Sequence, residues 1–220
     1  MEIDMEVNQP GSSNVECLGE KILYLKRLFS EDGYAVNKEA KALHFDKEGT
    51  SKMLYGETVF DIIEPIFCND SISPYLKGKK SFCDLGSGTG NVVVSSAHLL
   101  GVFERYTGIE ILERMYTYSQ EKRDIFISDF PEFAGRVNFI NGDILNVDLS
   151  FYDVFFINYP MSDSILQERF FRKIEKELSV GDVVIMGIGM LDSEYFEIID
   201  SIVFEFSWGP GSCRYYVKVK

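Results

Sequence analysis

A glycine-rich loop between an apolar run and an amphipathic segment is the feature that most constrains this fold. It reads Asp84-Leu85-Gly86-Ser87-Gly88-Thr89-Gly90, after a strand-like run over 81–85 and before a predicted helix over 91–100. Glycines let the backbone turn tightly and approach a ligand without an intervening Cβ. The unpaired N–H groups that begin the next helix suit a carboxylate or a phosphate. The loop therefore predicts a ligand site at the end of a buried strand.

From residue 81 onward, short apolar runs alternate with amphipathic segments. We expect strands at 81–85, 105–110, 137–140, 154–158 and 182–188, and helices at 91–100, 112–126 and 164–178 with a short one at 193–198. Two final runs, 202–207 and 214–218, flank Trp208-Gly209-Pro210-Gly211 and predict a hairpin. The pattern predicts an α/β fold: a seven-stranded, mostly parallel, doubly wound sheet that ends in an antiparallel hairpin.

The N-terminal third divides into two predicted parts. Residues 1–16 lack periodicity and are expected to form a flexible arm, whereas apolar residues from Leu18 to Leu28 recur at helical spacing. Gly33 is expected to end this helix, 34–57 to be irregular, and a second helix to begin near Thr58 and be kinked or shortened by Pro65. The predicted domains are the arm at 1–16, a small helical cap and cofactor-covering segment at 17–76, and a ligand-binding domain at 77–220.

Charge and composition exclude several classes of protein. The chain has 35 acidic and 22 basic side chains in 220 residues, so it should repel phosphate backbones and attract basic partners. Four cysteines without C-x-x-C spacing and only two histidines argue against a metal site. An acidic, polar N-terminus and the lack of any apolar run of about 20 residues argue against a signal peptide and a membrane span. We therefore expect an intracellular protein that binds neither nucleic acid nor membrane directly.

Two further acids help to define the ligand. An Asp beside a G-x-G-x-G loop is unfavourable for a pyrophosphate but suits S-adenosylmethionine, which carries an ammonium and a sulfonium. Glu110 ends the second predicted strand, where an acid holds ribose hydroxyls, and Asp143 follows the third, where it can accept from the adenine amino group. Each of the two acids taken alone also fits an ordinary strand-end or turn position. Together the three placements predict an S-adenosylmethionine site.

These motifs resemble those of class I S-adenosylmethionine-dependent methyltransferases over 81–184. Leu54-Tyr55-Gly56-Glu57-Thr58, the glycine loop, Val154-Phe155-Phe156-Ile157-Asn158 and the ending Trp208…Tyr215-Tyr216 are similar to Dot1-type lysine methyltransferases. The resemblance implies that Asn158, Tyr159 and Tyr55 lie at the transferable methyl group, and that S-adenosylhomocysteine is the product. It also implies that the cofactor is bound by Tyr55, Thr58, Asp84, Gly86, Ser87, Gly88, Gly90, Glu110, Asp143, Ile144 and Asn158.

The substrate follows from the same resemblance. A lysine acceptor must lose a proton, which an aromatic channel favours by desolvation. The candidates for such a channel, each equally compatible with a core position, are Tyr55, Tyr159, Trp208, Tyr215 and Tyr216. Tyr159-Pro160 replaces the family's Asn-Phe, and the strongest basic cluster is only Lys77, Lys79 and Lys80. The expected function is a Dot1-like lysine N-methyltransferase of histone H3 in the nucleus. The alternatives are a cytoplasmic methyltransferase of a non-histone basic protein, or a catalytically silent cofactor-binding subunit.

Overall fold

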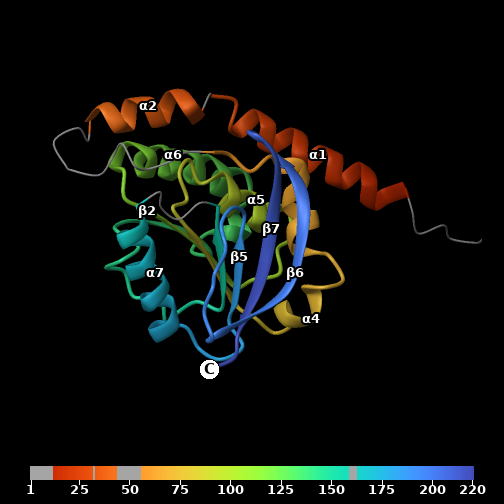
Figure 1. Cartoon of the computed structure of the whole chain (residues 1–220). Coiled ribbons are helices and arrows are strands. Elements are labelled where there is room, and N and C mark those ends of the chain that lie inside the picture. The colour runs from red at the N-terminus through yellow and green to blue at the C-terminus, as the bar shows by residue number, and fades with distance from the viewer. Residues whose placement is uncertain (1–11, 32, 44–55, 159–162) are drawn as a thin grey trace, which may run out of the picture.

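The computed structural model describes residues 12–31, 33–43, 56–158 and 163–220, and it is built on one seven-stranded sheet (Figure 1). The strand order is β3-β2-β1-β4-β5-β7-β6, and β7 runs antiparallel to both of its neighbours while the first five strands are parallel. The bounds are β1 Ser81–Leu85, β2 Arg105–Glu110, β3 Val137–Asn141, β4 Val154–Ile157, β5 Val183–Met186, β6 Phe196–Phe206 and β7 Gly209–Lys218. The predicted fold class is confirmed.

Helices cover both faces of the sheet, but unequally. They are α1 Ser12–Leu28, α2 Gly33–Leu43, α3 Ile63–Phe67, α4 Ser73–Leu76, α5 Asn91–Leu99, α6 Glu113–Asp129 and α7 Ser164–Glu177, with 3₁₀ turns η2 Phe60–Ile62 and η3 Pro131–Phe133. Leu25 of α1, Val93 of α5 and Phe126 of α6 pack in one core with the sheet, whereas Phe170 and Ile174 of α7 pack on the opposite face. Figure 1 shows α1 and α2 across the top of the molecule and α7 alone at its side.

The central strands are buried because both faces are covered. Every residue of β1, β4 and β5 is buried, which is typical of parallel strands between two helical layers. The carboxyl ends of β1 and β4 therefore lie side by side at one edge of the sheet. In a doubly wound sheet this edge, where the strand order reverses, is the place at which ligands bind.

The N-terminal segment is more helical than predicted. α1 begins at Ser12, inside the predicted arm at 1–16, and Gly33 begins α2 where an irregular segment was expected. Val36 and Ala40, one turn apart, pack against α6 beside Met115. These two small residues give a weak sequence signal, and the contact with α6 stabilises the helix. The second helix is short, as expected, because α3 spans only five residues; however, it begins at Ile63 and not near Thr58, and Pro65 lies in its first turn, where a proline is tolerated, so the chain does not break there. The domain boundaries at residues 16 and 76 stay a prediction.

The C-terminal segment differs from the sequence prediction in one element. The helix expected at 193–198 is wrong, because Phe196 begins the eleven-residue strand β6. The turn of the hairpin is Ser207–Trp208, one position earlier than expected, since Phe206 pairs with Gly209. β6 pairs with β7 along its length, and this non-local pairing outweighs the local helical pattern. No described helix is long and apolar enough to cross a bilayer.

Candidate active site

A cleft of about 230 Å³ opens at the carboxyl edge of the sheet, above β1 and β4. Its walls come from five parts of the chain: residues 56–58, the loop after β1 with the start of α5, the end of β4, the segment after β5 and the segment after β6. The lining residues are Gly56, Glu57, Thr58, Asp84, Leu85, Gly86, Ser87, Gly88, Thr89, Asn91, Val92, Phe156, Asn158, Ile188 and Trp208. The cleft thus brings together Thr58, Asp84, Gly86, Ser87, Gly88 and Asn158 from the predicted site.

The glycine loop forms the floor of the cleft. The N–H groups of Gly86 and Ser87 donate to the carbonyl of Ile109 at 2.9 and 3.0 Å, which ties the loop to β2. Gly86 has φ +82°, a conformation that side chains disfavour, and no atom lies within 4 Å of the place where its Cβ would be. Gly90 also has a positive φ, but a Cβ there would meet Phe139 at 2.5 Å. Gly86 therefore leaves space for a ligand, whereas Gly90 permits close packing and is not among the lining residues.

Glu110 holds the loop from behind. Its Oε2 accepts from the Gly88 N–H at 2.9 Å, and its Oε1 accepts from the Leu112 N–H at 2.8 Å. The side chain is buried, and burial raises the pKa of this carboxyl while the backbone hydrogen bonds oppose the rise. Glu110 does not line the cleft, so its predicted contact with ribose hydroxyls stays a prediction. Its hydrogen bonds give it a second role, the fixing of the loop.

Asp84 supplies a buried carboxylate at the end of β1. It is 3% exposed, and burial raises its pKa well above the usual value, with the charge of Glu110 adding to the rise. Two neighbouring buried acids disfavour each other's charged form. A cation bound in the cleft would offset both effects, because an opposite charge within a few ångströms stabilises a carboxylate.

Residues 56–58, here called the strap, cross one side of the cleft and are held by contacts from distant elements. The Asn158 amide donates to the Gly56 carbonyl at 3.1 Å, and the Asn91 amide donates to the Thr58 carbonyl at 3.0 Å. The Glu57 N–H donates to Ser207 Oγ at 3.0 Å, and the Ser207 N–H donates back to the Glu57 carbonyl at 3.2 Å.

Trp208 explains why the strap begins with glycine. A Cβ on Gly56 would lie 2.5 Å from the Trp208 ring, so only glycine fits beneath the indole. The ring also stacks on Phe206 with centroids 4.6 Å apart. The tip of the C-terminal hairpin thus fixes the position of the strap from above.

Asn158 lies directly after β4, between the strap and Gly187, the residue that follows β5. Its Oδ1 is buried and has no hydrogen-bond partner among the described residues. It lies against Gly187, where any Cβ would overlap with it. The cleft therefore contains a positioned amide with unused capacity to accept a hydrogen bond.

The other predicted residues fall outside the cleft. Asp143 is half-buried, and its Oδ1 accepts from the Leu145 N–H at 2.8 Å, so it stabilises the turn after β3. Ile144 packs with the core on the α7 face. Their contacts with the cofactor stay predictions. Tyr55 and Tyr159 lie outside the described residues.

The channel aromatics divide between the cleft and the core. Trp208 lines the cleft, but Tyr215 and Tyr216 do not. Tyr215 is fully buried, and its hydroxyl accepts from the Asn69 amide at 3.3 Å; the Tyr216 hydroxyl accepts from the Leu191 N–H at 3.2 Å. Of the two positions left open for these tyrosines, channel or core, the structure shows the core, because they face opposite sides of the sheet within its cores.

Sequence reasoning missed the lining residues Thr89, Asn91, Val92, Phe156 and Ile188. The first three lie within or just after the glycine loop, and their position at a helix start was a usable signal. Phe156 lies on β4, and Asn158 follows two residues later, directly after the strand, so both side chains are on one face of the sheet. Ile188 follows β5, and its place is fixed by the strand order.

The residues of the cleft fit S-adenosylmethionine. Gly86 leaves open space for a ligand, and Asp84 offers a negative charge to its ammonium or sulfonium group. Thr58 Oγ1 is buried and lacks a hydrogen-bond partner among the described residues. A zwitterionic ligand with a positive sulfur would satisfy these groups better than a pyrophosphate would.

Comparison with known proteins supports this assignment. Among solved structures, the chain is similar to an RNA methyltransferase from Salinibacter ruber in complex with S-adenosyl-L-homocysteine, with a TM-score of 0.57 and 18% identity over 76% of this chain and 95% of that one. It is also similar to a putative RNA methyltransferase from Pyrococcus horikoshii, with a TM-score of 0.53 and 17% identity over 83% and 96%. A mitomycin 7-O-methyltransferase gives a TM-score of 0.55 and 13% identity over 94% and 67%. These likenesses establish the fold.

The family is established by sequence. No curated protein matches the chain. The family model "Histone methylation protein DOT1" matches residues 33–195, which is more than half of the chain and includes the strap, the glycine loop, Glu110 and Asn158. The chain therefore belongs to the DOT1 family of histone methylation proteins, and it is an S-adenosylmethionine-dependent methyltransferase of the class I fold.

Proposed function

We propose that the chain is a protein lysine N-methyltransferase whose acceptor is a histone H3 lysine. The observation that carries this proposal is the strap, because it builds a wall with Trp208 and Asn158 beside the cofactor floor. The strap and Asn158 lie within residues 33–195, the segment matched by the histone methylation family, whereas Trp208 lies beyond it. An apolar and aromatic boundary at the reacting end suits an extended amine side chain.

The chain's own residues would act mainly by positioning. S-adenosylmethionine supplies the methyl group when bound. Asn158 is held by the Gly56 carbonyl, and its free Oδ1 can accept a hydrogen bond from the acceptor amine or from the cofactor. Phe156 and Trp208 reduce the access of water, which lowers the pKa of a lysine amine and favours its neutral, nucleophilic form. Correct alignment of the amine with the methyl group then accounts for most of the acceleration.

The charge of the chain favours a basic protein as acceptor. A net charge of −13 attracts histones and similar proteins and repels RNA at long range. Two of the similar solved structures are described as RNA methyltransferases, but their identity to this chain is too low to transfer a substrate. A non-histone basic protein is the second candidate acceptor, favoured by the lack of any extended basic segment for nucleosomal DNA.

Incubation with S-adenosylmethionine labelled in its methyl group tests the proposal. Free histones, nucleosomes, RNA and a cell lysate are the acceptors. Label on histone H3 is the expected result, and label confined to a non-histone band or to RNA would contradict the histone assignment. Tight cofactor binding without any label would indicate a silent subunit instead.

Asn158→Ala provides the matched test of the mechanism. We expect turnover to fall by about 10²-fold or more, as for loss of one positioned polar group at the reacting atoms, with a much smaller loss of cofactor affinity. Asn138→Ala, which changes an exposed amide on β3, is the control and should leave both unchanged. Equal losses of turnover and affinity in Asn158→Ala would refute its placement at the methyl group.

A further inference from the structure

β6 forms the end of the sheet, and its outer edge pairs with no other strand among the described residues. The strand order stops at β6, and its interstrand backbone hydrogen bonds are with β7 alone within the described chain. A β-bulge between Ile198 and Asp200 interrupts the first part of the strand. The regular part of this edge is therefore 201–206, an extended segment available for pairing.

The direction of the free backbone groups follows from Pro210. Pro210 lies opposite Glu205 and has no N–H to donate. Glu205 and Pro210 therefore form a non-hydrogen-bonded pair of the antiparallel ladder. Because such pairs alternate, the backbone groups of Ser201, Val203 and Glu205 point away from β7. One of these groups already has a partner, since the Ser201 N–H donates to Asp200 Oδ1 at 2.7 Å. The N–H groups of Val203 and Glu205 remain available to another strand.

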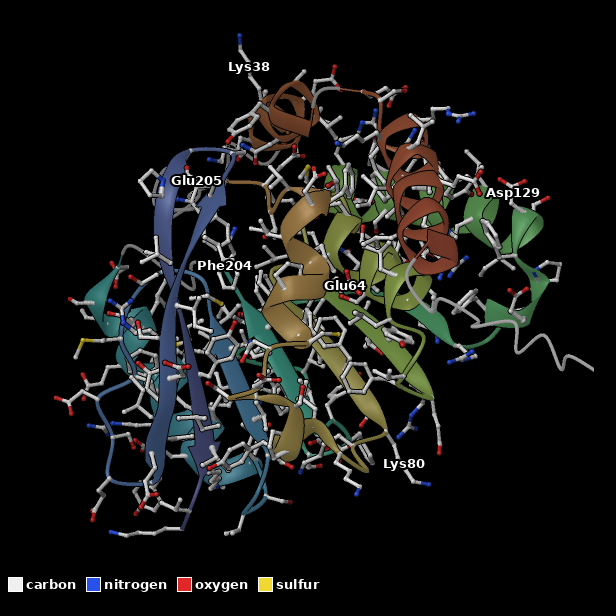
Figure 2. All side chains as sticks on the ribbon, turned by 90° about the vertical axis from the view of Figure 1, so that its right-hand side faces the viewer. Lys38, Glu64, Lys80, Asp129, Phe204 and Glu205 are labelled. Carbon is white, nitrogen blue, oxygen red and sulfur yellow. The ribbon has the colours of Figure 1, made fainter. Side chains whose placement is uncertain are left out.

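The side chains of this edge combine apolar surface with negative charge. Val203 is 65% exposed and Ile198 is 58% exposed. The strand carries Glu197, Asp200 and Glu205, and it has no lysine or arginine between 196 and 206. Natural edge strands are protected by charged side chains, especially lysine, by proline, by β-bulges or by covering elements. β6 has a bulge near its start and carboxylates along its length, but residues 201–206 contain no lysine or proline. In Figure 2, Glu205 lies near the tip of the hairpin, while Phe204 lies on the side that faces α3.

The edge leads toward the cleft. β6 runs parallel to β4 and β5, because β7 is antiparallel to both of its neighbours, so Phe206 ends at the ligand-binding edge of the sheet. Trp208 follows two residues later and lines the cleft. A strand added beside β6 would lie about 19 Å from β4, or four strand spacings, a span that about six extended residues cover.

We propose that the outer edge of β6 binds an extended, basic segment of the methyl-acceptor protein by β-strand addition. The inference rests on the proposed function, which supplies a protein acceptor. The backbone of Val203 and Glu205 pairs with the segment, and the carboxylates of the strand attract its lysines and arginines. The acceptor lysine then lies about six residues from the paired stretch, near Asn158.

Charge decides between this occupant and a second copy of the chain. Pairing of two β6 edges would bring the same carboxylates together, and like charges on neighbouring strands are destabilising. Both copies would also carry a charge of −13. A basic segment instead gains from the same charges, which makes it the favoured partner.

Hydrogen exchange on the full chain tests the edge directly, with S-adenosylhomocysteine present. The probe is a short synthetic peptide of alternating lysine and valine, and the control is its counterpart of glutamate and valine. We expect the lysine peptide to slow exchange of the Val203 and Glu205 amides at least tenfold and to leave the inward-facing Phe204 amide unchanged. No slowing at saturating peptide, equal slowing by the glutamate peptide, or concentration-dependent slowing without peptide would overturn the proposal.

Two pairs of variants connect the edge to turnover. Val203→Pro removes an outward N–H, a change that an edge strand tolerates. We expect it to raise KM for the acceptor protein about tenfold and to leave kcat unchanged. Val203→Thr keeps the N–H, so its KM should stay within twofold of the wild-type value. Glu205→Lys should raise KM more than Glu205→Gln. An unchanged KM in a folded Val203→Pro protein would refute the edge. No methylation by the wild-type chain would count against the proposed function, and the exchange experiment would then decide the edge independently.

Discussion

Gly86 and Gly78 offer a matched test of the cofactor site. Both have a φ near +80°, at +82° and +81°, and neither has an atom within 4 Å of the place where a Cβ would lie. Their alanine variants therefore carry the same backbone strain and no steric clash within the protein. They differ in location, because Gly86 lines the cleft at the carboxyl edge whereas Gly78 precedes β1 at the opposite end of that strand.

The expected magnitudes follow from this geometry. A left-handed conformation costs a residue with a Cβ about 1–2 kcal/mol, which lowers Tm by roughly 2–8 °C in a chain of this size. We expect both Gly86→Ala and Gly78→Ala to show this loss. Only Gly86→Ala places a methyl group into the ligand space, and we expect its affinity for S-adenosylmethionine to fall at least tenfold, about 1.4 kcal/mol. Gly86→Arg should abolish binding.

Thermal unfolding and calorimetric titration with S-adenosylmethionine measure the two effects separately. Equal cofactor affinity in Gly86→Ala and Gly78→Ala would refute the placement of the ligand over the loop. A much larger loss of stability in Gly86→Ala than in Gly78→Ala would show that the space above Gly86 is filled by the protein itself.

Three further predictions concern the supports of the site and of the fold. Glu110→Gln places an amide N–H₂ against the N–H of Gly88 or of Leu112, so urea unfolding should show a loss of about 2 kcal/mol; an unchanged midpoint would contradict this. His98 is buried among aromatic rings, and burial lowers its pKa from 6.5 to about 4. Between pH 6.5 and 4 the unfolded chain therefore binds more protons than the folded chain, so the free energy of unfolding should fall by up to about 3 kcal/mol over this range. His98→Phe should show a smaller fall, and a pH profile identical to that of the wild type would refute the role of His98. Lys218 is buried, and its Nζ donates to two carbonyls at the end of α7, so Lys218→Met should lower the free energy of unfolding by about 1–3 kcal/mol in the same assay; a stability equal to that of the wild type would mean that solvent can satisfy these carbonyls.

The features that local chemistry controls could be predicted from the sequence. The glycine loop, the strand before it and the helix after it depend on residues within about ten positions of one another, and the structure confirms all three. The acid at the end of β2 was placed correctly for the same reason, since Glu110 ends a strand in which every residue after Arg105 is buried. The alternation of strands and helices then restricts the fold to a parallel sheet, because connections between parallel strands need a crossover.

Elements that depend on distant partners could not be predicted in this way. The segment at 193–198 has a local pattern compatible with a helix, but Phe196 begins a strand because β7 is available to pair with it. α2 forms where Val36 and Ala40 contact α6. The sequence of α2 does not indicate that α6 will pack against it, nor does the sequence of α6 indicate α2. Tyr215 and Tyr216 are adjacent in sequence, yet the pleat of β7 sends them into opposite cores.

The cleft shows the same division. Its floor is a local motif, readable from the seven consecutive residues Asp84 to Gly90, because a glycine's backbone freedom is an intrinsic property. Its wall depends on Glu57 and Ser207, which are 150 residues apart and meet only because the hairpin folds back over the sheet edge. Side-chain chemistry along the chain is enough to indicate which ligand is bound, while the shape of the space around that ligand arises from contacts that exist only once the chain has folded.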